Sequence, residues 1–144
     1  MKQAGEQKYW IVVASKDHIK LGIDGGFVQS NHGKATSLKR MSKGDGLIVY
    51  SLGQTYGKKS DLKSFTAIGK VANKELYQVT MSEDFMPYRR NIHYYPSHDV
   101  PVEPLIDRLD FIRNKKSWGY AFRFGFLEIP RKDFELIKAE MTKG

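Results

Sequence analysis

The segment Tyr9-Trp-Ile-Val-Val-Ala-Ser15 decides how this chain folds. Its apolar run is β-branched and aromatic, and it stops abruptly at the polar residues Ser15-Lys-Asp-His18. A second short apolar run, Leu47-Ile-Val-Tyr-Ser51, follows the glycine-rich turn Lys43-Gly-Asp-Gly46. Short β-branched runs bounded by turn residues are typical of buried strands. The sequence therefore predicts two buried strands whose polar ends form the rim of a pocket.

Length and composition indicate one globular domain. The chain has 144 residues, 40% apolar and 28% charged, and we expect residues 1–144 to form a single domain with a flexible N-terminus over residues 1–8. The absence of cysteine excludes disulfides, cysteinyl zinc sites and thiol nucleophiles. The four histidines lack the spacing of a metal site, so we expect neither a metal nor another cofactor.

No segment resembles a membrane anchor or a secretion signal. The apolar runs are much shorter than the roughly 20 residues that cross a bilayer. The first eight residues lack the apolar stretch of a signal peptide. We therefore expect a soluble, cytoplasmic protein.

The charge of the chain favours a polyanionic partner. The formal net charge is +8 and the pI is about 9.6. Clustered Lys and Arg side chains gain free energy by displacing counterions from phosphates, which favours nucleic acid, although a merely solvated basic surface is the alternative. The basic residues form four clusters, at Lys34 to Lys43, Lys58 to Lys63, Arg89-Arg90 and Arg113 to Lys116.

The rest of the chain predicts a small curved sheet with helices at its edges. Phe65–Ala72 and Glu75–Met81 have the composition of two strands joined by a hairpin at Asn73-Lys74. Phe122, Phe124 and Phe126 alternate, which predicts one shared face of a final strand. We expect helical turns at Lys16–Asp24 (stopped by Gly25), Lys34–Met41, Leu105–Ile112 and after Pro130, and extended segments at Phe27–Ser30, Pro87–Tyr95 and Trp118–Ile129.

The order of these motifs resembles the EVE-domain family over about Tyr9 to Met141. The matching blocks are Tyr9–Ser15, Gly26–Gln29, His32–Lys34, Leu38–Met41, Phe65–Gly69, Tyr88–Asn91, and Trp118-Gly119 through Arg123–Gly125. The resemblance implies an α+β fold, a PUA-like mixed β pseudobarrel of roughly five or six strands flanked by short helices, with a C-terminal helix. It also implies kinship with YTH readers of methylated adenine in RNA and with ASCH domains.

The resemblance further implies a non-catalytic module that binds nucleic acid and recognises a modified base, such as methylated cytosine or adenine. Such a base leaves the duplex stack or comes from a single strand, and aromatic faces then hold its ring while polar groups test its edge. Ser15 lies where YTH relatives place a pocket serine, and Phe27 lies near the position of their cage tryptophan. The sequence leaves open whether the partner is DNA or RNA.

Fourteen residues are candidates for this interface. The base-binding candidates are Ser15, Phe27, Gln29, His32, Gly33, Lys34, Tyr50, Ser51, Trp118 and Arg123. The phosphate-binding candidates are Lys39, Arg40, Arg89 and Arg90. Structural roles compete with these assignments. A serine before a helix caps it, a phenylalanine packs in a core, and an arginine completes an ion pair.

Two other functions compete with base recognition. The run Ser15-Lys-Asp-His18 contains nucleophile and base residue types, as an ASCH-like amidohydrolase of modified nucleosides requires. Adjacent positions do not face one another, however, so we expect no catalytic residues. A nucleotide or small-molecule sensor is the other alternative, and its binding would hardly change with salt.

Overall fold

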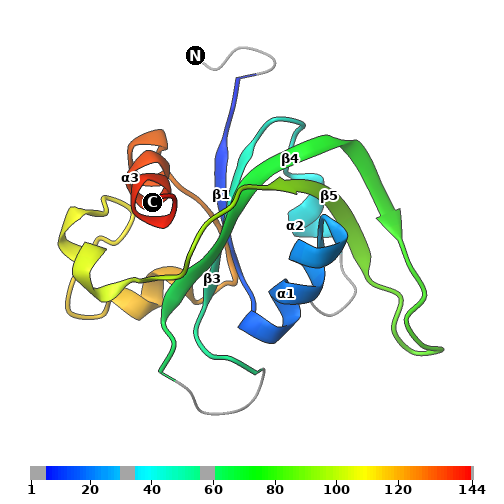
Figure 1. The fold of residues 1–144 in the computed structure, drawn as a ribbon, viewed down its shortest axis with the longest axis horizontal. Coiled ribbons are helices and arrows are strands. Elements are labelled where there is room, and N and C mark those ends of the chain that lie inside the picture. Colours follow the sequence, from blue (N-terminus) through cyan, green and yellow to red (C-terminus); the bar gives the residue numbers. More distant parts are fainter. Residues whose placement is uncertain (1–5, 30–34, 56–60, 144) are drawn as a thin grey trace.

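The computed structural model describes residues 6–29, 35–55 and 61–143 and shows a curled sheet flanked by short helices (Figure 1). The strands are β1 (Tyr9–Val13), β2 (Phe27–Gln29), β3 (Gly46–Ser51), β4 (Ser64–Gln78), β5 (Tyr88–Tyr94), β6 (Val100–Pro101) and β7 (Phe126–Glu128). The helices are α1 (Lys16–Gly25), α2 (Thr36–Lys39), α3 (Arg131–Met141) and the 3₁₀ segments η2 (Glu103–Arg108) and η3 (Trp118–Phe122). No helix within these ranges is long and apolar enough to cross a membrane.

The sheet is mixed and curls back on itself. Its strand order is β2-β5-β4-β3-β1-β7, with β6 paired to β4. β1 and β3 are parallel, whereas the other strand pairs are antiparallel. Val28 of β2 nevertheless packs in the same apolar cluster as Trp10 and Val12 of β1. Because β2 and β1 are distant in the strand order, the apolar cluster that they share lies inside a sheet that curls into a pseudobarrel (Figure 1).

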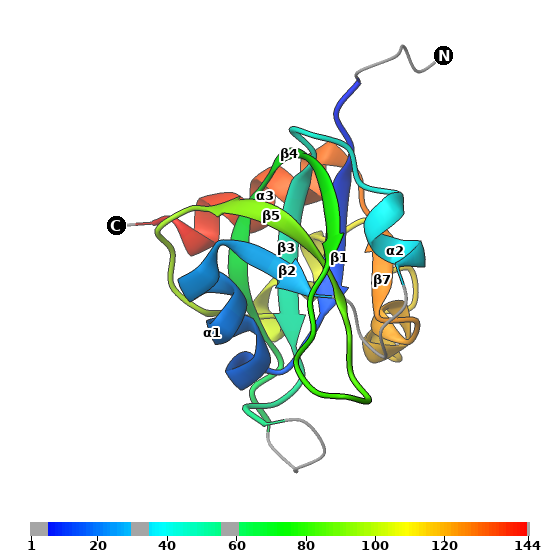
Figure 2. The same ribbon diagram turned by 90° about the vertical axis from the view of Figure 1, so that its right-hand side faces the viewer.

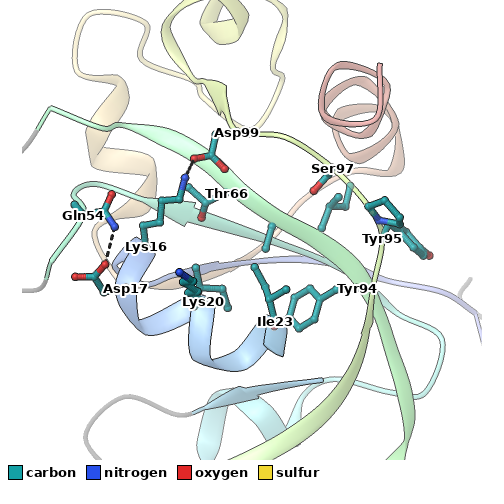
Figure 3. Close-up of a pocket in the computed structure, with 14 residues that line it drawn as sticks. Lys16, Asp17, Lys20, Ile23, Gln54, Thr66, Tyr94, Tyr95, Ser97 and Asp99 are labelled. Atoms are coloured by element: carbon teal, nitrogen blue, oxygen red, sulfur yellow. Dashed lines mark hydrogen bonds and ion pairs between the residues drawn. The ribbon is translucent and has the colours of Figure 1, made fainter. Parts of the chain in front are cut away.

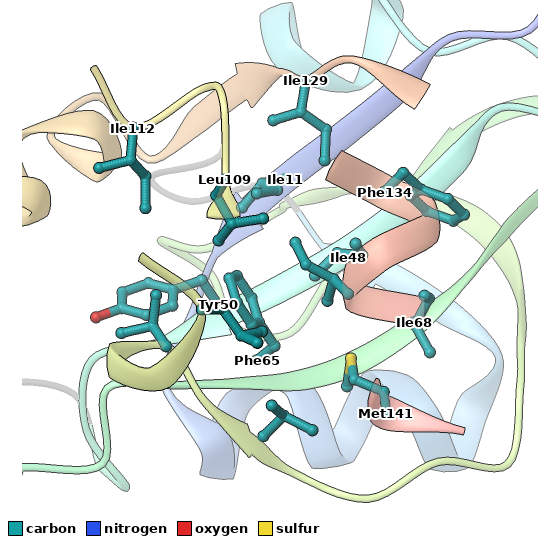
Figure 4. Close-up of a cluster of buried hydrophobic side chains, with 14 of the residues drawn as sticks. Ile11, Ile48, Tyr50, Phe65, Ile68, Leu109, Ile112, Ile129, Phe134 and Met141 are labelled. Atoms are coloured by element: carbon teal, nitrogen blue, oxygen red, sulfur yellow. The ribbon is translucent and has the colours of Figure 1, made fainter. Parts of the chain in front are cut away.

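Helices α1 and α3 cover opposite faces of the sheet. Ile48 and Ile68 point toward α3 and pack in the main core with Phe134, Ile137 and Met141 (Figure 4). Their neighbours Val49 and Ala67 point the other way and contact Ile19 of α1. Successive side chains of a strand alternate between the two faces of the sheet, so each face packs against its own helix.

Most of the predicted elements are confirmed. The runs at Tyr9 and Leu47 form buried strands, and all of β3 is buried. Helix α1 agrees with the prediction within one residue, but Gly26 rather than Gly25 ends it, in the left-handed conformation with φ 73°. The elements β2, α2, β5 and α3 confirm four further segments, and the predicted helical piece near Leu105 is a 3₁₀ helix.

The predicted hairpin at Asn73-Lys74 is wrong. The chain does not reverse there, because β4 continues through it as one strand of 15 residues. The register of β4 against β5 shifts over residues 72–75, which form a bulge. Asn73 Oδ1 accepts a hydrogen bond from the Glu75 amide at 3.0 Å, and the Asn73 carbonyl accepts one from Arg90 at 3.0 Å. These bonds satisfy polar groups that the bulge removes from the regular ladder.

The predicted final strand over Trp118–Ile129 is wrong in its first half. Trp118–Phe122 is a 3₁₀ helix, and the strand extends only from Phe126 to Glu128. Gly125, between them, has a φ of 74°, which interrupts the extended conformation. As a result the phenylalanines do not share a face, because Phe122 is buried in the core whereas Phe124 is 80% exposed.

Candidate functional site

A flat, polar-edged cluster forms where β2 pairs with β5. Gln29 lies opposite Arg89 in this antiparallel pair, and Phe27 is on the same face. The guanidinium carbon of Arg89 lies 3.8 Å from the centroid of the Phe27 ring, and Arg89 Nε donates to Gln29 Oε1 at 2.9 Å. Phe27 and Gln29 are buried, so they hold the guanidinium plane in a fixed orientation.

The first turn of α1 adds an imidazole to this cluster. Ser15 is the N-cap of α1 and accepts from the His18 amide through Oγ at 3.3 Å. Burial lowers the pKa of His18, and the charge of Arg89 lowers this pKa further. His18 Nε2 has no hydrogen-bond partner among the described residues. We call Ser15, His18, Phe27, Gln29 and Arg89 the Phe27 site.

The sequence raises His18 only within the amidohydrolase alternative, for which we expect no catalytic residues, whereas in the structure His18 lies close enough to Arg89 for that charge to lower its pKa. An N-cap serine three positions before a histidine places that histidine at the start of a helix, and this spacing was the available signal. The electrostatic effect of Arg89 on the pKa of His18 depends on how α1 packs beside β5. No pattern in the sequence predicts that packing. His32, Gly33 and Lys34, also proposed as base-binding residues, lie outside the described residues.

Tyr50, Ser51 and Trp118 lie away from the Phe27 site. The Tyr50 ring stacks on Phe122 in the α3-side core at 4.0 Å between centroids, and burial, with a smaller effect of Glu103, raises its pKa to about 12. Ser51 is buried, and its Oγ shares a hydrogen bond of 2.7 Å with Thr66 Oγ1. Trp118 packs edge-on against Phe122.

The two adjacent arginines of β5 point to opposite faces, as the alternation predicts. Arg89 belongs to the Phe27 site, whereas Arg90 is only 4% exposed. The Arg90 guanidinium donates to the carbonyls of Leu38, Met41 and Asn73 at 2.9, 2.7 and 3.0 Å, and burial lowers its pKa. Arg90 therefore ties α2 to the bulge of β4.

The surface near α2 is basic. A cavity of about 380 Å³ is lined by Lys39, Met41, Ser42, Lys43, Lys74, Leu76 and Arg90. The three lysines are exposed and make no ion pair with described residues. Arg40, beside them, places its guanidinium 5.1 Å from the Trp10 ring and 5.5 Å from the Phe126 ring. Lys39 and Arg40 are thus accessible to a phosphate, whereas Arg90 is engaged by backbone carbonyls.

A larger cavity of about 480 Å³ lies between α1, β4 and the segment after β5 (Figure 3). Lys16 forms an ion pair with Asp99 at one side of it, and Asp17 accepts from Gln54 at 2.6 Å. Ile23 lies beside Tyr94, and both line the apolar part of the cavity. The side chains of Ser15 to His18 therefore make separate contacts, and they are not aligned as a nucleophile with its base.

The fold defines a PUA-like α+β domain. A hypothetical protein from Leishmania major has a similar structure, with a TM-score of 0.62 and 13% identity, covering 94% of this chain and 95% of that chain. The Pho92 YTH domain, solved in complex with m6A, gives a TM-score of 0.61 at 14% identity, covering 100% of this chain and 89% of that domain. At these identities the likeness concerns the fold.

The sequence similarity of this chain to known proteins identifies its family. The model of the EVE domain matches residues 8–140. A UPF0310 protein of Mycobacterium avium is 44% identical over 133 residues, which cover 92% of this chain and 96% of that relative. The chain belongs to the EVE-domain family, as the motif order in the sequence predicted.

Proposed function

We propose that this protein is a non-catalytic module that binds nucleic acid and holds a modified base at the Phe27 site. The arrangement of Arg89 on Phe27 carries this proposal. A nucleobase has two flat π faces and a polar edge, and it stacks well on an arginine plane. The inner face of the Arg89 guanidinium rests on Phe27 at 3.8 Å. A base stacks on its outer face, while Gln29 holds the guanidinium from behind through its bond to Arg89 Nε.

Two further observations support a nucleic-acid ligand. The YTH domain that shares this fold was solved in complex with m6A, a methylated adenine derivative. The net charge of +8 favours association with phosphates. The base enters from a single strand or is flipped out of a duplex, because a stacked base pair exposes neither face.

Selectivity for a modified base has a physical limit. Burial of one methyl group contributes about 1 kcal/mol, which corresponds to roughly a fivefold difference in affinity. A larger preference requires a wall that also excludes water or a polar contact that the unmodified base cannot satisfy. We therefore expect a preference of about fivefold or more over the plain strand.

Titrations by fluorescence anisotropy test this proposal. Short DNA and RNA strands carry one methylated cytosine, hydroxymethylated cytosine or methylated adenine, and plain strands of identical sequence serve as references. At least one modified strand binds more tightly than its reference. Equal affinities for all modified and plain strands would overturn the proposal.

A pair of charge-conserving variants locates the base. Arg89→Lys keeps the positive charge but removes the flat plane, so the preference for the modified strand falls toward unity. Arg131→Lys makes the same change at an exposed position of α3, on the opposite face of the sheet, and leaves the preference unchanged. An unaltered preference in Arg89→Lys would show that the base binds elsewhere.

A further inference from the structure

Two aromatic side chains project into solvent from η3 and from the turn that joins it to β7. Tyr120 is 64% exposed and Phe124 is 80% exposed, which makes them the most exposed large apolar side chains in the described part of the chain. Removing such rings from water is favourable, so their exposure in a folded protein is typical of a surface that binds a partner. Neither ring contributes to the apolar cores.

Arg123 holds these two rings together. Its guanidinium carbon lies 3.7 Å from the centroid of Tyr120 and 4.4 Å from that of Phe124. One guanidinium nitrogen donates to the Tyr120 carbonyl at 2.7 Å, and Arg123 forms no ion pair with the described residues. The three side chains thus form one ordered surface of flat groups, which we call the aromatic platform. Ordering before binding reduces the entropy lost when a ligand docks.

The surroundings of the aromatic platform are positively charged. The sequence from Phe111 to Leu127 contains four basic residues and no acidic residue. Arg113 and Lys116 are exposed in this stretch. Flat aromatic faces combined with positive charge are the typical surface for single-stranded nucleic acid, since the rings stack with bases and the cations contact phosphates.

The aromatic platform lies at the same end of the sheet as the Phe27 site. Gly125 accepts from the Val13 amide at 2.9 Å, at the last residue of β1. Two residues further along the chain, Ser15 caps α1 and begins the Phe27 site. Figure 2 shows the turn that contains η3 (orange) and the start of α1 (blue) both near the lower end of the sheet. When the modified base of a nucleic-acid strand occupies the Phe27 site, the neighbouring nucleotides of that strand therefore lie at the end of the protein that carries the aromatic platform.

We infer that the aromatic platform stacks the bases that flank the recognised base in a single strand. This inference rests on the proposed function and adds a second contact to it. Phe124 stacks one flanking base on its open face, and Arg123 and Tyr120 extend the stack. Because every base has a π face, the contact strengthens binding of any strand sequence and contributes little to the choice of modification.

The experiment compares a single nucleotide with a strand. Both ligands carry the modification that wild type prefers, one as the mononucleotide and one within a single strand of about seven nucleotides, within the range of single-strand site sizes. Phe124→Ala lowers the affinity for the strand about fivefold or more, the effect of losing one stacked base. The affinity for the mononucleotide stays at the wild-type value. Phe124→Leu keeps apolar area but removes the flat face, and it loses nearly as much.

The controls separate stacking from other effects. Leu21→Ala removes an apolar side chain that is 47% exposed on α1, and it leaves both affinities unchanged. Because Phe124 and Tyr120 contact solvent, circular dichroism melts of their variants match those of wild type. In all platform variants the ratio of affinities for modified and plain strands is retained, whereas failure of the proposed function would remove that ratio in wild type itself.

Three outcomes would overturn the inference. In one, Phe124→Ala and Tyr120→Ala bind the strand as wild type does. In another, the affinities for mononucleotide and strand fall equally, which would place Phe124 inside the base site. In the last, wild type self-associates in light scattering and Phe124→Ala is monomeric with unchanged strand affinity, which would assign the aromatic platform to a protein contact.

Discussion

Neighbouring residues of one strand perform different tasks in β5. Arg89 faces outward over Phe27, where its planar cation is available to a ligand. Arg90 faces inward, where its guanidinium donates hydrogen bonds to three backbone carbonyls in place of water. These three bonds stabilise the buried guanidinium, although its Nε has no partner among the described residues, so Arg90 does not leave the carbonyls to follow a phosphate. At the scale of the residue, the face of the strand decides the role.

Asp45 supplies a test of the buried polar contacts. This carboxylate is 1% exposed and accepts from Trp10 Nε1, the Ser42 amide and the Lys8 amide at 2.8, 2.8 and 3.1 Å. Asp45→Ala leaves these donors without an acceptor and lowers the free energy of unfolding by about 2–4 kcal/mol. Asp45→Asn retains one acceptor oxygen and loses less. Urea denaturation followed by tryptophan fluorescence measures both, and an unchanged midpoint in Asp45→Ala would contradict this account.

His18 makes stability depend on pH. Its pKa is lowered below the ordinary value of about 6.5, so the unfolded chain takes up the proton at a higher pH than the folded chain does. The stability gained from neutral His18 is present above about pH 6.5 and is lost as the pH falls through the pKa of the folded protein. His18→Gln therefore flattens the decline in free energy of unfolding between about pH 7 and pH 5.

Urea denaturation at several pH values measures the slope of unfolding free energy against pH in both proteins. Identical slopes in wild type and His18→Gln would show that other groups cause the acid dependence.

At the scale of the element, the pairing of β4 with β5 depends on close contact of backbones. A Cβ added at Gly69 would lie 2.3 Å from the His93 carbonyl oxygen and 2.9 Å from the Tyr94 Cα. Gly69→Ala must therefore separate the strands, and we expect a loss of about 2 kcal/mol or more, or roughly 5–10 °C in Tm. Differential scanning calorimetry measures this shift.

Gly119→Ala is the matched control. A Cβ at Gly119 meets nothing within 4 Å, so the same substitution leaves Tm within about 1 °C of wild type. A similar drop in both variants would attribute the effect to loss of glycine itself and not to the contact between the strands.

The sequence predicted elements whose stability is local and failed where distant residues decide. Local sequence patterns predict β1 and β3 from their apolar runs, and α3 from its periodic apolar face. Asn73-Lys74 has the composition of a turn, yet Arg90 of the neighbouring strand stabilises a bulge there. The alternating phenylalanines indicate a strand, but Phe122 instead stacks on Tyr50, a contact that no local pattern shows.

The same distinction applies to the candidate site. Phe27 and Gln29, predicted to bind a base, and Arg89, predicted to bind phosphate, contact one another in the fold, and Ser15 caps the helix that carries His18. Tyr50 was proposed as a pocket residue because its strand ends beside β1, but its side chain points to the α3 face. The direction of a side chain depends on which face of the sheet each helix covers, and the sequence does not specify that arrangement.

At the scale of the whole molecule, long-range charge should govern binding. For single strands, each phosphate contact contributes about −0.7 to the slope of log affinity against log salt concentration. Lys39→Ala removes an exposed cation of the basic cavity near α2 and reduces the steepness of this slope by about that amount, with the preference for modified strands unchanged. Titrations at several salt concentrations measure both quantities.

Lys132→Ala provides the comparison for the same loss of charge. Lys132 is paired with Asp110 at 3.1 Å beside α3, away from the Phe27 site. This variant keeps the wild-type slope. Equal changes in both variants would indicate that net charge alone, and not a defined track of phosphates, controls affinity.

The pairing of β1 with both β3 and β7 also affects how the protein is made. Trp10 lies opposite Leu47 on one side and Glu128 on the other, so the first strand finds its last neighbour only near the other end of the chain. On the ribosome, β1 emerges early and waits with an unpaired edge until β7 has left the exit tunnel. Such distant pairings slow folding, because the intervening chain must be ordered before they form. During synthesis the Trp10 strand thus keeps an unpaired edge that chaperones or other unfolded chains can contact.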